Sequence, residues 1–143
     1  VLFNYVERHG MPLFEMINNK VGEHRLVFLV HGGVDTEDRE KARQIAETTH
    51  DSIIVASYGT FSTGINIRNL HNVVFASPSK SKVRNLQSIG RVLRKGDHKT
   101  KAVLYDIADD IGKNYTLNHL IERVKLYNEE NFNYEFIDVR IRE

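Results

Sequence analysis

The chain has 143 residues, of which 41% are hydrophobic and 27% charged, and it contains no cysteine. This composition supports a folded domain with a hydrophobic core, and it excludes a disulfide scaffold, a thiolate metal site, a collagen-like repeat and a disordered chain. Twenty basic and nineteen acidic side chains leave a net charge of +1, so total charge alone does not indicate a nucleic-acid or membrane partner.

Five short apolar runs, rich in β-branched and aromatic residues, are predicted to be strands. They do not alternate apolar with polar residues, which suits strands that are buried on both faces of a parallel sheet. The five runs are Val1 to Val6, Leu26 to Val30, Ile53 to Ala56, Val73 to Ala76, and Ala102 to Ile107.

Segments of helical period lie between these strands. We expect a short helix from Pro12 through Ile17, one that Asp35 or Thr36 caps, and one from Ser81 to Leu93. One side of the capped helix is formed by four residues at the spacing i, i+3, i+4 and i+7, namely Ala42, Ile45, Ala46 and Thr49. The alternation of strands and helices predicts an α/β fold, a three-layer sandwich with a mostly parallel central sheet and right-handed crossovers.

The pattern changes near residue 111, so we expect a main domain over residues 1–111 and a C-terminal helix and strand over 112–143. Leu117 to Tyr127 has an amphipathic period, and Asn131 to Arg142 alternates like a strand. The alternation changes parity after Phe136, which predicts a bulge or a break there. The aromatic residues of this tail could stack on bases, but a strand packed on the domain is the preferred interpretation.

No apolar run approaches the roughly 18 residues that a membrane span needs, so we expect no membrane segment. The chain begins inside an apolar run and shows no secretion signal, and the lack of cysteine suits a reducing compartment. We therefore expect a cytoplasmic protein, and we interpret the chain as part of a longer polypeptide.

Positive charge is concentrated between residues 80 and 101. This segment has eight basic residues and one acidic residue, a local charge of +7, which leaves −6 for the rest of the chain. Within it, Gln87, Arg91 and Arg94 share one sector of the predicted helix at i, i+4 and i+7. Two neighbouring guanidinium groups suit an anion between them and bind phosphate oxygens bidentately, whereas the alternative is a solvated basic helix face.

Two turns that follow predicted strands are candidates for binding phosphate or ribose. The first combines glycine amides with the start of a helix, and its alternative is an ordinary turn. The second opens a stretch dense in hydroxyl groups and glycines, and its alternative is a long polar loop. The candidate residues of the two turns are His31, Gly32, Gly33, Ser57, Tyr58, Gly64 and Asn66.

The sequence has no metal-ligand pattern and no nucleotide-binding loop of its own. Its seven histidines lack ligand spacing, and a strand end with a helix cap explains Asp106, Asp109 and Asp110 better than a Mg²⁺ site does. The phosphate-binding pattern Gly-x-x-x-x-Gly-Lys-Ser/Thr (Walker A) and the acidic strand end that accompanies it (Walker B) are both missing. The chain can therefore supply arginines to a nucleotide but cannot hold its phosphates unaided.

Taken in chain order, these motifs resemble the second RecA-like motor domain of superfamily-two helicases. The resemblance covers about residues 1–108 and is carried by His31-Gly32-Gly33, the strand into Ser57, Gly64-Ile65-Asn66-Ile67 and Gln87-x-x-Gly90-Arg91-x-x-Arg94. It implies a RecA-like fold without the phosphate loop. It also implies an ATP-dependent DNA helicase that unwinds and branch-migrates recombination or stalled-fork DNA.

The resemblance also implies roles for single residues. Arg94 would be the arginine finger and Arg91 a second γ-phosphate contact, with Gln87 positioning the pair. Gly64 and Asn66 would contact the ribose. ATP and Mg²⁺ would be bound mainly by a preceding N-terminal RecA-like domain of the same polypeptide, so we expect this chain alone to be inactive.

The remaining candidates would contact nucleic acid. The turn from His31 to Gly33, together with Ser57 and Tyr58, would bind backbone phosphates of single-stranded or branched DNA without reading its sequence. Two alternatives stay open: a non-catalytic α/β nucleic-acid-binding module, and an RNA helicase of the same superfamily.

Overall fold

The computed structural model describes residues 1–64, 67, 70–77, 102–110, 112 and 115–142. Four predicted site residues lie outside these ranges, and so does the predicted helix from Ser81 to Leu93. The four residues are Asn66, Gln87, Arg91 and Arg94.

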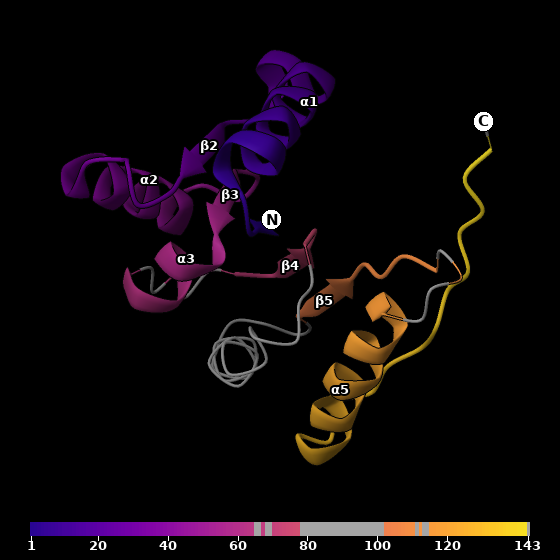
Figure 1. The fold of residues 1–143 in the computed structure, drawn as a ribbon. Coiled ribbons are helices and arrows are strands. Elements are labelled where there is room, and N and C mark those ends of the chain that lie inside the picture. Colours follow the sequence, from indigo (N-terminus) through magenta and orange to yellow (C-terminus); the bar gives the residue numbers. More distant parts are fainter. Residues whose placement is uncertain (65–66, 68–69, 78–101, 111, 113–114, 143) are drawn as a thin grey trace.

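Within the described ranges, five parallel strands form one sheet in the order β2-β3-β1-β4-β5 (Figure 1). The strands are β1 (Leu2–Phe3), β2 (Val27–Val30), β3 (Ile53–Ser57), β4 (Asn72–Phe75) and β5 (Val103–Asp106). Each strand lies on one of the predicted apolar runs. The prediction of an α/β fold with a parallel sheet is therefore confirmed.

The described helical segments follow the expected order along the chain. They are η1, a π-helix (Val6–Gly10), α1 (Met11–Val21), η2, a 3₁₀ turn (Gly22–His24), α2 (Thr36–Thr48), α3 (Tyr58–Gly64) and α5 (Tyr115–Glu129). None of the helices in the described ranges is long and apolar enough to cross a membrane.

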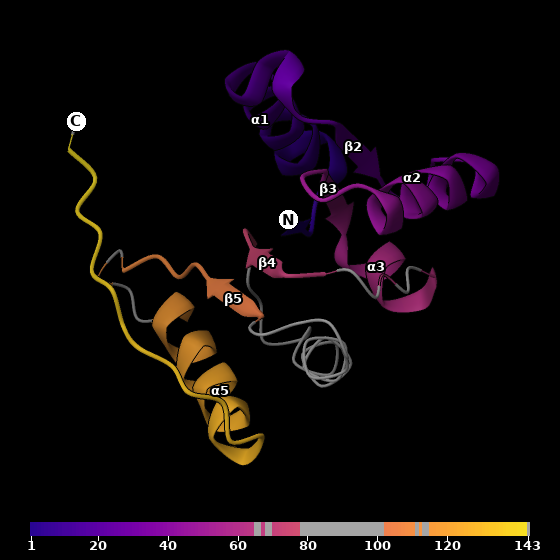
Figure 2. The same cartoon turned by 180° about the vertical axis from the view of Figure 1, so that it is seen from behind.

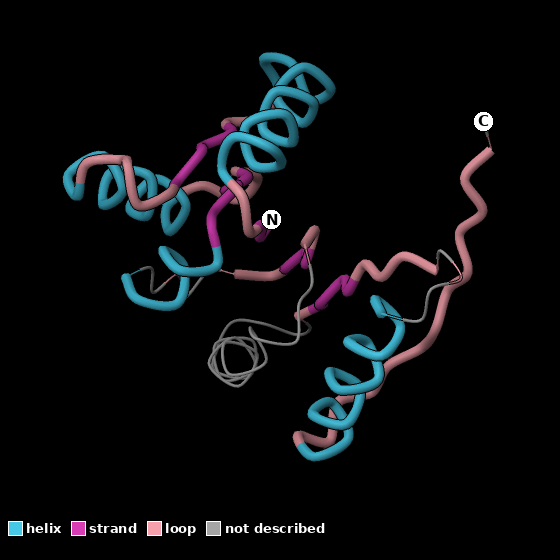
Figure 3. Tube along the Cα trace, viewed as in Figure 1, coloured by secondary structure: helices cyan, strands magenta, loops and turns pink. Residues whose placement is uncertain are grey.

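Right-handed crossovers explain how α1 and α2 are arranged. The chain passes from β1 beyond β3 to reach β2 and then returns to β3, so the two connections run in opposite directions across the sheet. Crossovers between parallel strands are right-handed almost without exception, which predicts that α1 and α2 lie on opposite faces of the sheet. Figures 1 and 2 show this arrangement from two sides, and Figure 3 separates helices, strands and loops by colour.

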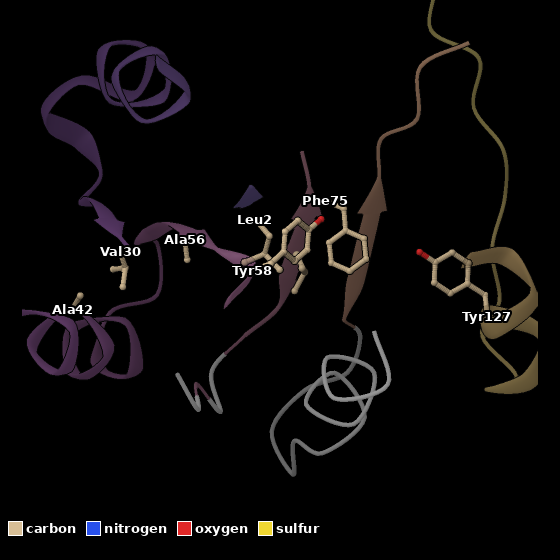
Figure 4. Packing of buried hydrophobic residues seen from close by; sticks show 8 residues of the cluster. Leu2, Val30, Ala42, Ala56, Tyr58, Phe75 and Tyr127 are labelled. Carbon is tan, nitrogen blue, oxygen red and sulfur yellow. The ribbon is translucent and has the colours of Figure 1, made fainter. Parts of the chain in front are cut away.

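The core lies along the sheet and includes one residue of the C-terminal helix. Tyr58 and Phe75 pack with ring centroids 5.6 Å apart, and Tyr127 reaches from α5 toward the sheet (Figure 4). The buried cluster consists of Leu2, Val30, Ala42, Ala56, Tyr58, Val73, Phe75 and Tyr127. The predicted apolar side of α2 is confirmed at Ala42 and Ala46, which are both buried.

The predicted strand over Asn131 to Arg142 is wrong. Asn131 has a left-handed φ of 56° and Phe132 N donates to Tyr127 O at 2.9 Å, which ends α5 and turns the chain back. The tail then runs beside α5 in Figures 1 and 2 without forming a strand, and Ile141 is 91% exposed. A strand needs a neighbour with free backbone N–H and C=O groups, and the backbone groups of a helix are already bonded within the helix. An alternating segment that lies beside a helix therefore finds no partner for strand pairing.

Candidate nucleic-acid interface

The carboxyl ends of the parallel strands bring the predicted turns to one edge of the sheet. Val30 is paired with Ala56, and Phe3 is paired with Ser57. His31, which follows β2, therefore lies at the same edge as Ser57 at the end of β3. Ligands bind at this edge in open α/β sheets, so the structure brings together two of the turns that the sequence singled out.

The turn from His31 to Gly33 is a compact and largely exposed loop before α2. Gly33 N donates to Nδ1 of His31 at 3.1 Å, and Val34 N donates to His31 O at 3.0 Å. Because Nδ1 accepts this hydrogen bond, the neutral ring carries its proton on Nε2, where it suits an oxygen acceptor. A Cβ atom built on Gly32 would have no neighbour within 4 Å, so a ligand backbone has room to approach there.

Ser57 and Tyr58 lie where β3 passes into α3, and both are engaged by the fold. The Ser57 hydroxyl donates to Oγ1 of Thr60 at 2.9 Å and accepts the amide of Thr60 at 3.4 Å, as an N-cap does. Tyr58 is only 3% exposed, so its side chain belongs to the core and only its backbone remains for a ligand. Gly64 is the last residue of α3, which replaces the long polar loop considered as the alternative.

Besides the turn at His31 and the residues Ser57 and Tyr58, this edge of the sheet carries polar residues that the sequence interpretation did not single out. Asn4, just after β1, donates from Nδ2 to the backbone oxygen of Ser77 at 3.0 Å. His9 of η1 forms a hydrogen bond through Nδ1 with the Ser77 hydroxyl. The only local signal was a polar residue, Asn4, directly after the buried pair Leu2 and Phe3.

Asp106, at the carboxyl end of β5, is engaged by α5. Arg123 donates from Nε to Oδ2 at 2.7 Å and from Nη2 to Oδ1 at 2.9 Å. The hydroxyl of Tyr127 donates to Oδ2 at 2.5 Å. Both oxygens of Asp106 are therefore occupied, and the interpretation of this residue as a strand end fits better than that of a Mg²⁺ ligand.

This cluster is almost completely excluded from water. The side chains of Arg123 and Asp106 are 2% and 10% exposed. Burial, followed by the negative charge of Asp106, raises the pKa of the Tyr127 phenol well above its usual range. The same two causes raise the pKa of Tyr58. The sequence showed no pattern that pairs Arg123 with Asp106, because the two residues are 17 positions apart on different elements.

Residues 1–96 match the family described as the helicase conserved C-terminal domain. The chain is 45% identical over 148 residues to the ATP-dependent DNA helicase uvsW of Enterobacteria phage T4, covering 94% of this chain and 29% of that protein. The crystal structure of T4 UvsW is similar, with a TM-score of 0.72 and 44% identity over 94% of this chain and 29% of that chain.

The name of a second relative refers to RNA instead of DNA. This relative is L396, a protein of Acanthamoeba polyphaga mimivirus provisionally named an ATP-dependent RNA helicase. The two are 31% identical over 97 residues, which is 68% of this chain and 17% of the relative. The chain thus spans less than a third of the length of either relative.

Proposed function

This chain belongs to the helicase conserved C-terminal domain family and has the fold of the second RecA-like domain of superfamily-two helicases, so we propose that it is the second motor domain of an ATP-dependent DNA helicase. The similarity to T4 UvsW along 94% of the chain is the observation that carries this proposal. It favours DNA over RNA because the match to the protein named as an RNA helicase is weaker and covers only 68% of the chain.

The proposed ATP site is divided between two domains. A preceding N-terminal RecA-like domain holds ATP, and this chain contributes Arg94 as the arginine finger, Arg91 as a second γ-phosphate contact and Gln87 as their positioning partner. An arginine that meets charge developing in the transition state accelerates hydrolysis by about 10³-fold or more. Gly64 and Asn66 contact the ribose.

Mg²⁺ enters this site with ATP and is bound mainly by the N-terminal domain. The ion neutralises charge on the phosphates when it is bound. In the described part of this chain no group of three His, Asp or Glu residues could hold a metal, and Arg123 and Tyr127 engage both oxygens of Asp106. The proposed contribution of this chain to hydrolysis is the pair Arg94 and Arg91.

The proposed DNA track lies at the carboxyl edge of the sheet. The turn from His31 to Gly33 offers an imidazole donor and open space at Gly32, and Ser57 with the backbone of Tyr58 adjoins it. These groups contact backbone phosphates, so binding tolerates any base sequence. Closing and opening of the cleft between the two domains moves the strand, and we propose branched recombination or stalled-fork DNA as the substrate.

The test uses this chain joined to an N-terminal domain that carries a phosphate-binding loop. Arg94→Ala is expected to lower DNA-stimulated ATP hydrolysis by about 10³-fold while ATP affinity changes little. Arg142→Ala, which removes an exposed arginine of the tail, serves as the control and is expected to hydrolyse ATP normally.

Three outcomes would contradict parts of the proposal. Normal turnover by Arg94→Ala would remove the finger assignment. Stimulation by RNA but not by DNA would favour an RNA helicase, and nucleic-acid binding with no hydrolysis by the joined protein would favour a non-catalytic binding module.

A further inference from the structure

The chain makes an uncommon turn directly after β1. Val6–Gly10 forms a single π-helical turn, in which Gly10 N donates to Tyr5 O at 2.9 Å. Such turns are rare and often occur at functional sites. This turn leads from the carboxyl edge of the sheet into α1, so its conformation determines where its side chains, such as that of His9, lie at that edge.

Packing against Phe3 determines where this turn lies. Phe3 is fully buried, and a Cβ atom built on Gly10 would lie 2.3 Å from Cε2 of the Phe3 ring. Glycine is therefore required for the turn to lie against the ring at this distance. The contact holds the residue before it, His9, in a defined position at the edge of the sheet.

His9 and Asn4 bind two different groups of Ser77. His9 binds the Ser77 hydroxyl, and Asn4 donates to the Ser77 backbone oxygen at 3.0 Å. The two contacts join residues 68 and 73 positions apart, and they link Asn4, just after β1, and His9 of η1 to Ser77, two residues beyond the end of β4. β1 and β4 are neighbours in the sheet at the point where the direction of the connections reverses, which is where doubly wound sheets bind ligands.

Ser77 is the last described residue before the segment that carries the predicted ATP contacts. The other end of that segment is also attached to the sheet, because Val103 N donates to His71 O at 2.9 Å as β5 begins. Strand pairing thus anchors one end, and the side chains of Asn4 and His9 anchor the other. Anchoring an end removes conformational freedom that would otherwise have to be lost when the site assembles.

We propose that Asn4 and His9 are positioning residues for ATP hydrolysis, which hold Ser77 and so determine where the arginine-bearing segment begins. The proposal rests on the proposed function and adds to it two residues outside the motifs that carry the family resemblance. Neither residue touches ATP. Both act through Ser77, so their loss should slow the chemical step more than it weakens ATP binding.

The experiment measures steady-state ATP hydrolysis with DNA present, using this chain joined to its N-terminal domain. His9→Ala is expected to lower kcat about tenfold while KM for ATP changes less than about twofold. His9→Asn is expected to recover most of kcat, because its amide can replace the hydrogen bond of Nδ1 to Ser77. Glu7→Gln changes an exposed side chain of the same π-helical turn and is the matched control, with the kcat of the unmodified protein.

A double-variant cycle identifies the partner through which His9 acts. Ser77→Ala should cause the same loss of kcat. Combining it with His9→Ala should cause no further loss, because both substitutions remove the same hydrogen bond between His9 and Ser77. If His9→Ala does not fold, Ser77→Ala alone must reproduce the loss of kcat while the thermal unfolding midpoint stays close to that of the unmodified protein.

Four results would overturn the proposal. The first two are an unchanged kcat in His9→Ala, and losses of kcat in His9→Ala and Ser77→Ala that add up in the double variant. The other two are a kcat in His9→Asn as low as in His9→Ala, and a His9→Ala variant that binds DNA more weakly while its kcat is unchanged. The proposed function is tested separately by Arg94→Ala. If Arg94→Ala is inactive and His9→Ala is normal, only the positioning role fails.

Discussion

The buried ion pair between Arg123 and Asp106 shows what one side chain can contribute to this fold. A charge removed from water is tolerated only when a partner and additional hydrogen bonds compensate it, and here Tyr127 adds a third hydrogen bond. The cluster joins α5 to the carboxyl end of β5. These three side chains therefore attach the C-terminal helix to the sheet, together with apolar side chains such as Val124 and Leu126 that pack on the core.

Removing Arg123 leaves the buried carboxylate of Asp106 without its compensating charge. Arg123→Met is expected to lower the free energy of unfolding by about 3–5 kcal/mol, as measured by urea denaturation. Lys125→Ala breaks an exposed pair with Glu122 on the same helix, and it is expected to change stability by less than about 0.5 kcal/mol. Equal effects of the two substitutions would show that the buried pair contributes little.

Tyr58 and Tyr127 make stability depend on alkaline pH. Each phenol has a raised pKa in the native state, whereas in the unfolded chain it ionises near pH ~10. The unfolded state therefore loses protons first as the pH rises, so the contribution of these two phenols to the free energy of unfolding should be constant below about pH 10 and should fall above it. Urea unfolding between about pH 8 and 11 should show a shallower fall for Tyr127→Phe than for Tyr5→Phe, which alters a tyrosine that is 70% exposed. Identical profiles would contradict this.

At the scale of elements, local pattern and long-range packing decide different properties. Pro12 lies in the first turn of α1, and Asp35 occupies the N-cap position of α2, so both helix starts lie where the sequence placed them. The Asp35 side chain forms no capping hydrogen bond, however. The π-helical turn could not be predicted, because it depends on the ring of Phe3 lying beneath Gly10.

The contact of Gly10 with Phe3 can be tested by adding one methyl group. Gly10→Ala is expected to lower the free energy of unfolding by about 1–3 kcal/mol, because the ring is buried and cannot move away freely. Gly59→Ala is the control, since a Cβ atom there meets nothing within 4 Å and alanine favours a helix. A Gly10→Ala variant as stable as Gly59→Ala would show that the turn adjusts easily.

At the scale of the whole molecule, the distribution of charge matters more than the total. The net charge is +1, yet the segment from residue 80 to 101 carries +7 and the rest of the chain −6. A protein polarised in this way attracts phosphate backbones through one segment. The proposed DNA binding should therefore weaken as salt increases.

The slope of log affinity against log salt measures how many phosphates are neutralised, at roughly 0.7 per contact for single-stranded DNA. Replacing Lys82 and Lys99 by glutamine should make the slope shallower. Replacing Lys20 and Lys125 removes the same charge outside the segment and should leave the slope nearly unchanged. Equal changes in slope would indicate a diffuse electrostatic interaction instead. Fluorescence anisotropy with a single-stranded oligonucleotide provides the measurement.

The five strands of the sheet, the order of the elements, the turn from His31 to Gly33 and the family could be predicted from the sequence alone, because apolar runs, helical period and motif spacing extend over a few neighbouring residues. The three-dimensional arrangement of the strands and helices decided that Tyr58 is in the core and that Asn4 and His9 hold Ser77. It also decided that the tail forms no strand where it runs beside α5. Each of these outcomes depends on a partner that the folded chain brings close, and no local pattern of residues specifies which partner that will be.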